Sequence, residues 1–155
     1  MNFSDKAVLF LATGFHIGNI PPAPGTFGSL IGLPLCFLLA QVNLAIAMAS
    51  AFLFIGLAVW IAHRAAKCLR QKDPGCIVID EIAGMAVAFI GLPFNPTTAV
   101  TGFVIFRTLD ILKPFPIRML DRRLSGGLGI VADDVVAGLF TNLIIRIFIY
   151  ISSIL

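Results

Sequence analysis

Two pairs of adjacent carboxylates open two of the apolar stretches of this 155-residue chain. Asp80 and Glu81 lie in GCIVIDEIAGMAVAF, and Asp133 and Asp134 lie in GIVADDVVAGLF, so these pairs hold four of the chain's 8 acidic residues. A carboxylate at the edge of hydrocarbon is costly unless it is hydrated, paired or bound to a cation, and two neighbouring carboxylates also repel each other. A divalent cation removes both costs. Mg²⁺ prefers a few carboxylates together with water and the phosphate oxygens of a substrate.

Each acidic pair is followed by a glycine one helical turn later. Asp80 and Gly84 stand at i and i+4, as do Asp134 and Gly138. On a helix, each carboxylate is therefore stacked over a residue without a side chain, where another backbone or a ligand can approach. The competing interpretation is that these acids are solvated residues at helix N-termini, favoured by the helix dipole. Two such pairs in a chain with so few acids favour the metal site.

The most charged segment is FRTLDILKPFPIRMLDRR. Arg107, Asp110 and Lys113 stand at i, i+3 and i+6, which predicts one face of a short helix that ends at the following prolines. A second turn carries further ionic residues, namely Arg118, Asp121, Arg122 and Arg123. Arginine and lysine suit phosphate oxygens, while the aspartates can orient these cations or add metal ligands. Taken alone, the segment fits equally well an amphipathic surface that binds anionic lipid nonspecifically.

Two glycine-rich stretches flank this chemistry. In GNIPPAPGTFGSLIG (residues 18–32), Thr26 and Ser29 open a predicted helix, whose first N–H groups attract anions and can cradle a phosphate. A capped turn is the commoner explanation, and the Gly-Lys-Ser/Thr ending of a nucleotide-binding loop is missing. In SGGLGI (residues 125–130), the glycines permit close approach to a ligand or form an ordinary loop before a helix.

The composition indicates an integral membrane protein that forms a single domain over residues 1–155. Hydrophobic residues make up 59% of the chain and charged residues 12%, whereas soluble domains carry about 25% charged residues. The net charge of +3 is too small and too scattered to suggest a nucleic-acid partner. The 3 cysteines show no CxxC pairing, which argues against a disulfide framework or a zinc site.

The apolar blocks predict an all-α fold, a small polytopic membrane bundle with short or broken helices. Residues 29–62 divide near Gln41 into a short helix and a full span, residues 82–106 are split by GLPFNP, and residues 135–155 can span. Lysine and arginine cluster in residues 64–72 and 107–123, so both segments should face the cytoplasm. The first two blocks would then be two-legged hairpins and the last would cross once, with the active site at the cytoplasmic interface.

Four stretches together resemble one protein family. In chain order they are PAPGTFGS, IVIDEIAGM, FRTLDILKPFPIRMLDRRLSGGLGI and ADDVVAG, and the likeness runs from Gly14 to Gly138. They resemble phosphatidylglycerophosphatase A, a bacterial membrane enzyme of phospholipid synthesis. The resemblance implies a mostly helical fold and a magnesium-dependent phosphatase. Such an enzyme converts phosphatidylglycerophosphate to phosphatidylglycerol and inorganic phosphate at the cytoplasmic (inner) membrane.

The family's acidic motif falls on Asp80 and Glu81, and its diacid falls on Asp133 and Asp134. We expect these four side chains to hold Mg²⁺ and, together with Asp110, to form the catalytic centre. The residues expected to bind the phosphate and the rest of the substrate lie in the glycine loop and the basic segment: Gly25, Thr26, Ser29, Arg107, Lys113, Arg118, Asp121 and Arg122. One departure is His16, in GFHIGNIPP, where the family pattern suggests a small residue, usually glycine.

Two other functions remain open at this level. A lipid phosphotransferase of the CDP-alcohol type also uses interfacial carboxylates and metal, although its longer acidic signature is absent. A non-enzymatic carrier could use intramembrane acids, but those acids would be needed at mid-bilayer, and these stand at block boundaries. The attacking group, water or one of the aspartates, and the oligomeric state are not determined by the sequence.

Overall fold

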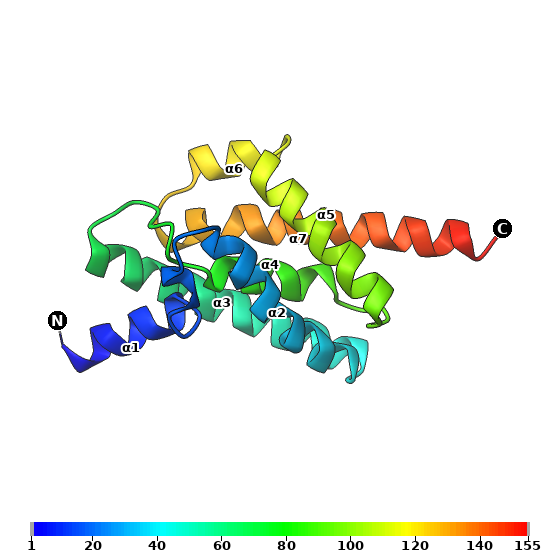
Figure 1. The fold of residues 1–155 in the computed structure, drawn as a ribbon, viewed down its shortest axis with the longest axis horizontal. Coiled ribbons are helices and arrows are strands. Elements are labelled where there is room, and N and C mark those ends of the chain that lie inside the picture. The colour runs from blue at the N-terminus through cyan, green and yellow to red at the C-terminus, as the bar shows by residue number, and fades with distance from the viewer. Residues whose placement is uncertain (1, 155) are drawn as a thin grey trace.

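The structure is a computed structural model that describes residues 2–154, and within that range it is all helical (Figure 1). The elements are α1 (Phe3–Ala12), the 3₁₀ turn η1 (Ile17–Asn19), α2 (Pro24–Ala40), α3 (Leu44–Leu69), α4 (Ile79–Ala88), α5 (Pro96–Leu112), α6 (Ile117–Arg123) and α7 (Gly126–Ser152). The prediction of an all-α fold with short and broken helices is confirmed.

The predicted breaks fall where side chains cap the next helix. Asn43 ends the gap between α2 and α3 by accepting a hydrogen bond from the Ile46 N–H at 2.9 Å. Asn95 starts α5 in a reciprocal capping pair with Thr98, and Pro96 occupies the first helical position, where its missing N–H does no harm. Local capping chemistry therefore sets these boundaries.

Two helical boundaries differ from the sequence prediction. The helix that carries Arg107 and Asp110 is not short, because these residues form the last turns of the 17-residue α5. The stretch SGGLGI is the first part of α7, which begins at Gly126. Gly127 permits this early start, because a Cβ atom there would collide with the Val59 carbonyl oxygen of α3. The close approach expected at these glycines is therefore made to another helix.

The short helix α4 lies at the centre of the bundle (Figure 1). Nearly all of its residues are buried, and it packs against α2, α3, α5 and α7. With 10 residues, α4 is too short to cross a bilayer, which takes about 20. Because other helices surround α4, the carboxylates of its first turn, Asp80 and Glu81, lie against protein.

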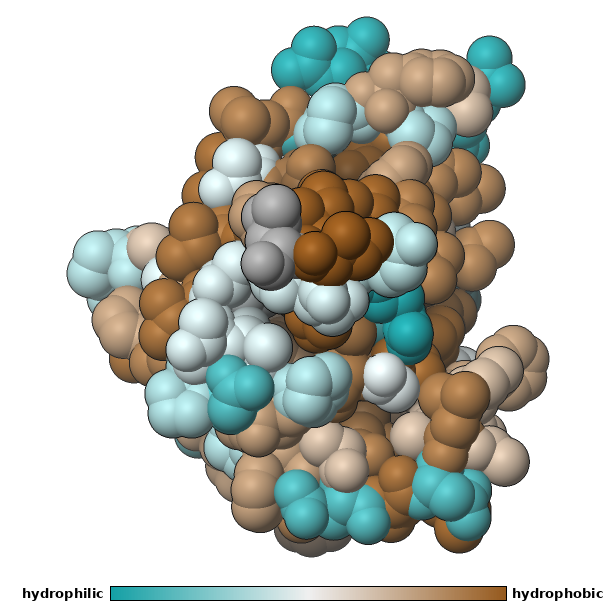
Figure 2. All heavy atoms as spheres, turned by 90° about the vertical axis from the view of Figure 1, so that its right-hand side faces the viewer, coloured by the Kyte–Doolittle hydropathy of each residue, from teal (hydrophilic) through white to brown (hydrophobic). Residues whose placement is uncertain are grey.

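The outer helices present a strongly apolar surface. Helices α3 and α7 are long and apolar enough to cross a membrane by length and composition. Side chains such as Phe52, Leu53 and Phe148 are largely exposed on them. In Figure 2, which looks at the end of the molecule where the C-terminus lies, hydrophobic residues cover much of the flanks, and the most hydrophilic residues gather mainly at the upper and lower edges. Such a surface fits a membrane protein.

The far end of α4 is fixed by two polar side chains of α7. The Asn142 side-chain amide donates to the carbonyl oxygens of Ala88 at 3.0 Å and Ile90 at 2.9 Å. The Arg146 guanidinium donates to the Ile90 carbonyl at 2.9 Å and accompanies Asn142, whose amide oxygen accepts from Arg146 Nε at 2.7 Å. Arg146, which interrupts the last apolar block of the sequence, is thus a cap for the carbonyl groups that follow α4.

Candidate metal and phosphate site

The carboxylate pairs are brought together by a parallel crossing of α4 and α7. A Cβ atom on Gly84 would lie 2.6 Å from the Asp134 carbonyl oxygen, and one on Gly138 would collide with the Gly84 carbonyl oxygen. The two helices therefore meet backbone against backbone at the glycines that follow Asp80 and Asp134. The sequence left open whether another backbone or a ligand approaches these glycines, and in the structure another backbone does.

Three carboxylates converge one turn before this crossing. Asp80, Glu81 and Asp134 each offer one oxygen, and these oxygens all lie within 4.8 Å of one another. Asp80 is 8% exposed and Asp134 is 4% exposed. Burial raises the pKa of Asp80 well above its ordinary value, and the charges of Glu81 and Asp134 raise it further. Burial also raises the pKa of Glu81, to which the charge of Asp110 adds. The cluster thus holds more negative charge than the protein around it neutralises.

Orphaned polar atoms mark the same place. Four buried side-chain atoms in the described part of the chain lack a hydrogen-bond partner, and they are Asp80 Oδ1, Glu81 Oε2, Arg107 Nε and Asp133 Oδ1. All four belong to residues that the sequence assigns to the site. An unsatisfied buried polar atom is destabilising and calls for an explanation such as an ion or a catalytic role. Unpartnered carboxylate oxygens in an all-oxygen donor set fit a hard divalent cation.

Arg107 brings one positive charge into the acidic cluster. Its guanidinium pairs with Asp110, one turn further along α5, and lies 4.0 Å from Glu81 Oε1. The helix α2 starts against the same two groups, because a Cβ atom on Gly25 would collide with Glu81 Oε1 and lie 3.0 Å from Arg107 Nη1. The predicted glycine loop therefore lies at the carboxylates, with the uncapped first turn of α2 facing them.

The hydroxyl groups of this loop are placed differently from one another. Ser29 is buried, and its hydroxyl donates to the Gly25 carbonyl oxygen at 2.8 Å, so it is occupied within the helix. Thr26 is half-buried in the first turn, and its backbone N–H donates to the Ala23 carbonyl oxygen at 3.0 Å. Neither side chain caps α2, since Ala23 precedes it with φ +61° and no side-chain cap bond is formed. The N–H of Gly25, by helix geometry, has no intrahelical acceptor.

Asp133 is not among the three converging carboxylates, and one of its oxygens is engaged elsewhere. Lys113 Nζ donates to Asp133 Oδ2 at 2.6 Å and to Asp121 Oδ1 at 2.9 Å. Burial would lower the pKa of Lys113, but these two hydrogen bonds and charges outweigh it, and the pKa is raised. Lys113 therefore stays positively charged at any physiological pH. Asp133 directly precedes Asp134 of the carboxylate cluster and is bound to a lysine, and its role as a metal ligand stays a prediction.

The remaining cations lie outside the cluster. Arg118, Arg122 and Arg123 of α6 are exposed and, among the residues that the structure describes, form no ion pair. Together with Lys113 they line a hollow of about 470 Å³, which we call the basic hollow; its other lining residues are Leu112, Pro114, Phe115 and Met119. The structure thus separates the predicted phosphate-binding cations into Arg107 within the cluster and a group at α6.

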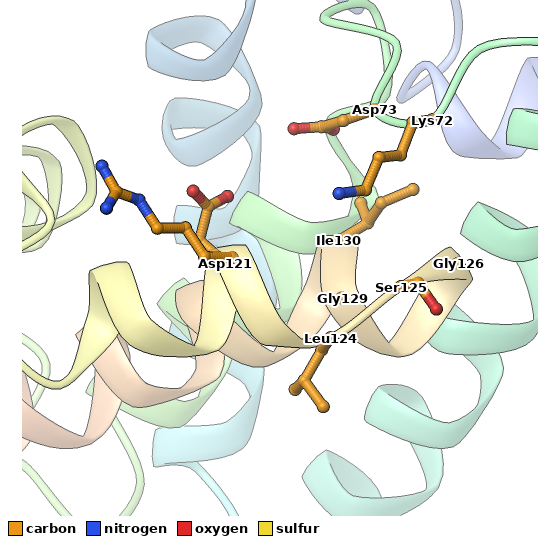
Figure 3. A pocket seen from close by; sticks show the side chains of 9 residues that line it. Lys72, Asp73, Asp121, Leu124, Ser125, Gly126, Gly129 and Ile130 are labelled. Carbon is orange, nitrogen blue, oxygen red and sulfur yellow. The ribbon is translucent and has the colours of Figure 1, made fainter.

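A second, smaller cavity of about 250 Å³ lies between α6, the start of α7 and the loop before α4 (Figure 3). Asp121 and Arg122 line it from α6, and Lys72 and Asp73 line it from the loop before α4. In Figure 3 the Lys72 side chain extends over the cavity, while Ser125, Gly126 and Gly129 lie along the start of α7. Sequence reasoning missed Lys72 and Asp73 at this position, because nothing in their spacing relates them to α6.

His16, where the sequence departs from the family pattern, has an unusual backbone conformation. His16 has φ +71°, in the left-handed region that glycine adopts without strain. Its ring is exposed, packs against Phe10 with centroids 5.2 Å apart, and lies beside the Asn19 side chain. The residue lines an apolar hollow formed largely by α1, whose lining residues include none of the carboxylates described above.

Comparisons with known proteins show the family of the chain. The model of the family "Phosphatidylglycerophosphatase A" matches residues 10–149. The chain is 42% identical over 132 residues to phosphatidylglycerophosphatase A of Escherichia coli, which covers 84% of this chain and 77% of that protein. It is 36% identical over 137 residues to phosphatidylglycerophosphatase A of Haemophilus influenzae, covering 87% of this chain and 84% of that protein.

A third relative carries a different name. The chain is 33% identical over 149 residues to a putative phosphatidylinositol-3-phosphatase of Bacteroides thetaiotaomicron, which covers 90% of this chain and 91% of that protein. No solved structure matches the chain. All the motifs that carry the sequence resemblance from PAPGTFGS onward lie inside the range matched by the family.

Proposed function

The chain belongs to the phosphatidylglycerophosphatase A family and is a phosphatase, and from this premise we propose that it hydrolyses the terminal phosphate monoester of phosphatidylglycerophosphate in a magnesium-dependent reaction. The products are phosphatidylglycerol and inorganic phosphate. The observation that carries the proposal is the cluster of Asp80, Glu81 and Asp134, in which one oxygen of each side chain converges with the others and in which Asp80 Oδ1 and Glu81 Oε2 lack a hydrogen-bond partner.

The proposed ligands of the magnesium ion are Asp80, Glu81 and Asp134. Their donors are all carboxylate oxygens, which suit a hard cation better than zinc or copper. When bound, the ion supplies charge neutralisation at phosphate oxygens and a lowered pKa for water. We propose that Asp133, which the sequence suggested as a further ligand, instead holds Lys113 at the rim of the cluster, because its Oδ2 is engaged by that lysine.

The chain's own positive groups bind the phosphate in this scheme. Arg107 stands between Glu81 and Asp110, and its Nε remains free to donate. The Gly25 N–H at the start of α2 offers a second donor directly beside it, favoured by the helix dipole. Both groups are fixed before substrate arrives, so they stabilise developing charge on the phosphate oxygens without reorganising. The attacking group is water or one of the cluster's carboxylates.

The proposed setting is the bacterial inner membrane, which the chain crosses more than once with its site facing the cytoplasm. Supporting this orientation, α3 ends and α7 begins at one end of the molecule, where Gly127 packs against His63. The basic segments at residues 64–72 and 107–123 adjoin that junction in sequence. Lipid substrate would reach the carboxylates without leaving the bilayer.

Phosphate release from phosphatidylglycerophosphate by the purified protein in detergent tests the proposal. We expect release with Mg²⁺ and none with EDTA, restored by adding Mg²⁺ back. No release by the folded wild-type protein in Mg²⁺ would refute the proposal. In that case, CMP release from a CDP-lipid and an alcohol would identify a phosphotransferase, and metal-dependent solute uptake into vesicles would identify a carrier.

A further inference from the structure

The cations that the sequence predicts to bind the substrate form two separate groups, although the substrate phosphate that is hydrolysed is a single group. Arg107 is half-buried inside the carboxylate cluster and is paired there with Asp110. Arg118 and Arg122 stand at i and i+4 on α6, so they share one face of that helix. Both are exposed, and neither pairs with any of the acidic side chains that the structure describes. Two groups of cations suggest two anions.

The basic hollow is amphipathic, which indicates what kind of anion it takes. Arg118, Arg122 and Arg123 line it beside Leu112 and Phe115, whose exposed fractions are 64% and 81%. Free arginine forks suit phosphate oxygens, while large exposed apolar side chains suit hydrocarbon. A hollow that combines them fits the phosphate of a lipid, where an anionic group is joined directly to acyl chains.

The basic hollow adjoins the carboxylate cluster through one lysine. Lys113 lines the hollow and donates to Asp133 at 2.6 Å. Asp133 directly precedes Asp134, whose oxygen belongs to the cluster. The hollow is lined by the end of α5, the connection that follows it and α6, and Lys113 links it to Asp133 on α7, next to the cluster residue Asp134.

We infer that the basic hollow binds the phosphodiester of the lipid substrate while the carboxylate cluster receives its terminal phosphate. This inference rests on the proposed function, since phosphatidylglycerophosphate carries both groups, joined by a glycerol unit. Arg118 and Arg122 are then specificity residues. They distinguish a lipid with two phosphates from phosphatidic acid, which has a terminal monoester but no phosphodiester.

The first test compares two substrates in micelles of uncharged detergent, which removes any contribution from an anionic membrane surface. The ratio of kcat/KM for phosphatidylglycerophosphate to that for phosphatidic acid is measured for wild type, Arg118→Gln, Arg122→Gln and the double variant. We expect each single change to lower this ratio about tenfold, the size of one charge-assisted hydrogen bond. Lys67→Gln, which removes an exposed cation of α3, is the matched control and should keep the wild-type ratio. An unchanged ratio in the double variant would overturn the inference.

The second test measures binding alone, so it does not depend on catalysis. Short-chain phosphatidylglycerol, which keeps the phosphodiester and lacks the monoester, is titrated into the protein in neutral detergent by calorimetry. We expect binding that exceeds that of short-chain diacylglycerol and that weakens about tenfold in Arg118→Gln and Arg122→Gln, but not in Lys67→Gln. Equal binding of the two lipids to wild type would refute the inference even if the enzyme is active.

Two further experiments test whether the arginines bind free phosphate or an anionic membrane surface instead of the lipid substrate. Inorganic phosphate is used as a competitor, and if it displaces phosphatidylglycerol from wild type, the hollow holds free phosphate and the inference is wrong. Flotation with vesicles containing phosphatidylglycerol tests adhesion to the bilayer. If the variants lose flotation but keep the wild-type substrate ratio, the arginines are a membrane anchor. If wild type releases no phosphate yet binds phosphatidylglycerol through these arginines, the proposed reaction fails while the lipid site remains.

Discussion

Both ends of the α4–α7 pair carry polar side chains, but the hydrogen-bonding groups of these side chains are satisfied to very different degrees. At the C-terminal end of α4, Asn142 and Arg146 donate to carbonyl oxygens that would otherwise be left free, and they also hydrogen-bond each other. At the N-terminal end, Asp80 and Glu81 each keep one buried oxygen without a partner. The same two helices thus carry a closed polar network at one end and an open one at the other.

This difference separates stability from chemistry. A completed network of hydrogen bonds rigidifies a structure, whereas an incomplete one that is buried is destabilising unless a ligand completes it. The Asn142 end fixes how α4 lies along α7, and the carboxylate end uses that fixed geometry to hold the converging oxygens that we propose as a cation site. Changes at the carboxylate end should therefore affect activity and metal binding, whereas changes at the Asn142 end should affect stability. Four measurements can test this.

The largest effect is expected when a cluster carboxylate is neutralised. Asp80→Asn or Asp134→Asn should lower kcat by more than about 100-fold, because losing even an outer partner of a metal ligand costs up to about 100-fold. The helix content should stay unchanged, since the amide fills the same space. Phosphate release and far-UV circular dichroism measure the two quantities. Asp73→Asn, on an exposed loop aspartate, is the control, and a similar loss of rate there would remove the distinction.

Metal binding should stabilise the wild-type protein through the open end only. An ion bound at 100 times its Kd stabilises the folded state by about 2.7 kcal/mol, which appears as a higher Tm in detergent with Mg²⁺ than with EDTA. Asp134→Asn should lose this increase. Its Tm without metal should equal or exceed that of wild type, because one of the mutually repelling buried charges is gone. An undiminished Mg²⁺-dependent rise in Tm for Asp134→Asn would place the ion elsewhere.

The glycine contact between the two ends should influence stability and activity together. Gly138→Ala inserts a Cβ atom against the Gly84 carbonyl oxygen, and overpacking of this kind costs about 1–3 kcal/mol. Because the helices must separate, the converging carboxylates also move apart, so activity and Mg²⁺ affinity should fall with Tm. Gly56→Ala is the matched control, since a Cβ atom there meets nothing within 4 Å. Full activity in Gly138→Ala would show that the crossing does not set the site.

The smallest effect is expected at the closed end. Asn142→Ala removes hydrogen bonds to the carbonyl groups that follow α4, and its cost should be about 1 kcal/mol because Arg146 still donates to Ile90. The Tm should fall by a few degrees, whereas kcat measured well below the Tm should stay near the wild-type value. A loss of kcat as large as that of Asp80→Asn would mean that the two ends are not separable.

Part of this arrangement was predictable because it is local. The break before α3 follows from the cap at Asn43, and the start of α5 follows from Asn95 and Pro96. The meeting of Asp80 and Asp134 follows from the glycine that stands one turn after each, which predicts a close approach without naming the partner. The all-α class and the convergence of Asp80, Glu81 and Asp134 were therefore within reach of the sequence.

The rest depends on packing between distant segments. Asp133 and Asp134 are adjacent, but neighbouring residues on a helix point about 100° apart, so one can join the cluster while the other turns to Lys113. Which of them does so is decided by how α7 rotates against α4. The capping role of Asn142 and Arg146 likewise exists only because α4 and α7 run parallel. The sequence of either segment alone does not predict this orientation.

The exposed apolar side chains beside the basic hollow have a kinetic consequence. Leu112 and Phe115 line the hollow together with the arginines, so a lipid that binds there, as we infer, would pass along exposed apolar side chains. A substrate that arrives by this route diffuses in two dimensions, and its effective concentration is its number per unit of membrane area. Diluting the substrate with neutral lipid at constant total substrate should then slow the reaction, whereas changing the volume of water around the same vesicles should leave the rate per enzyme unchanged.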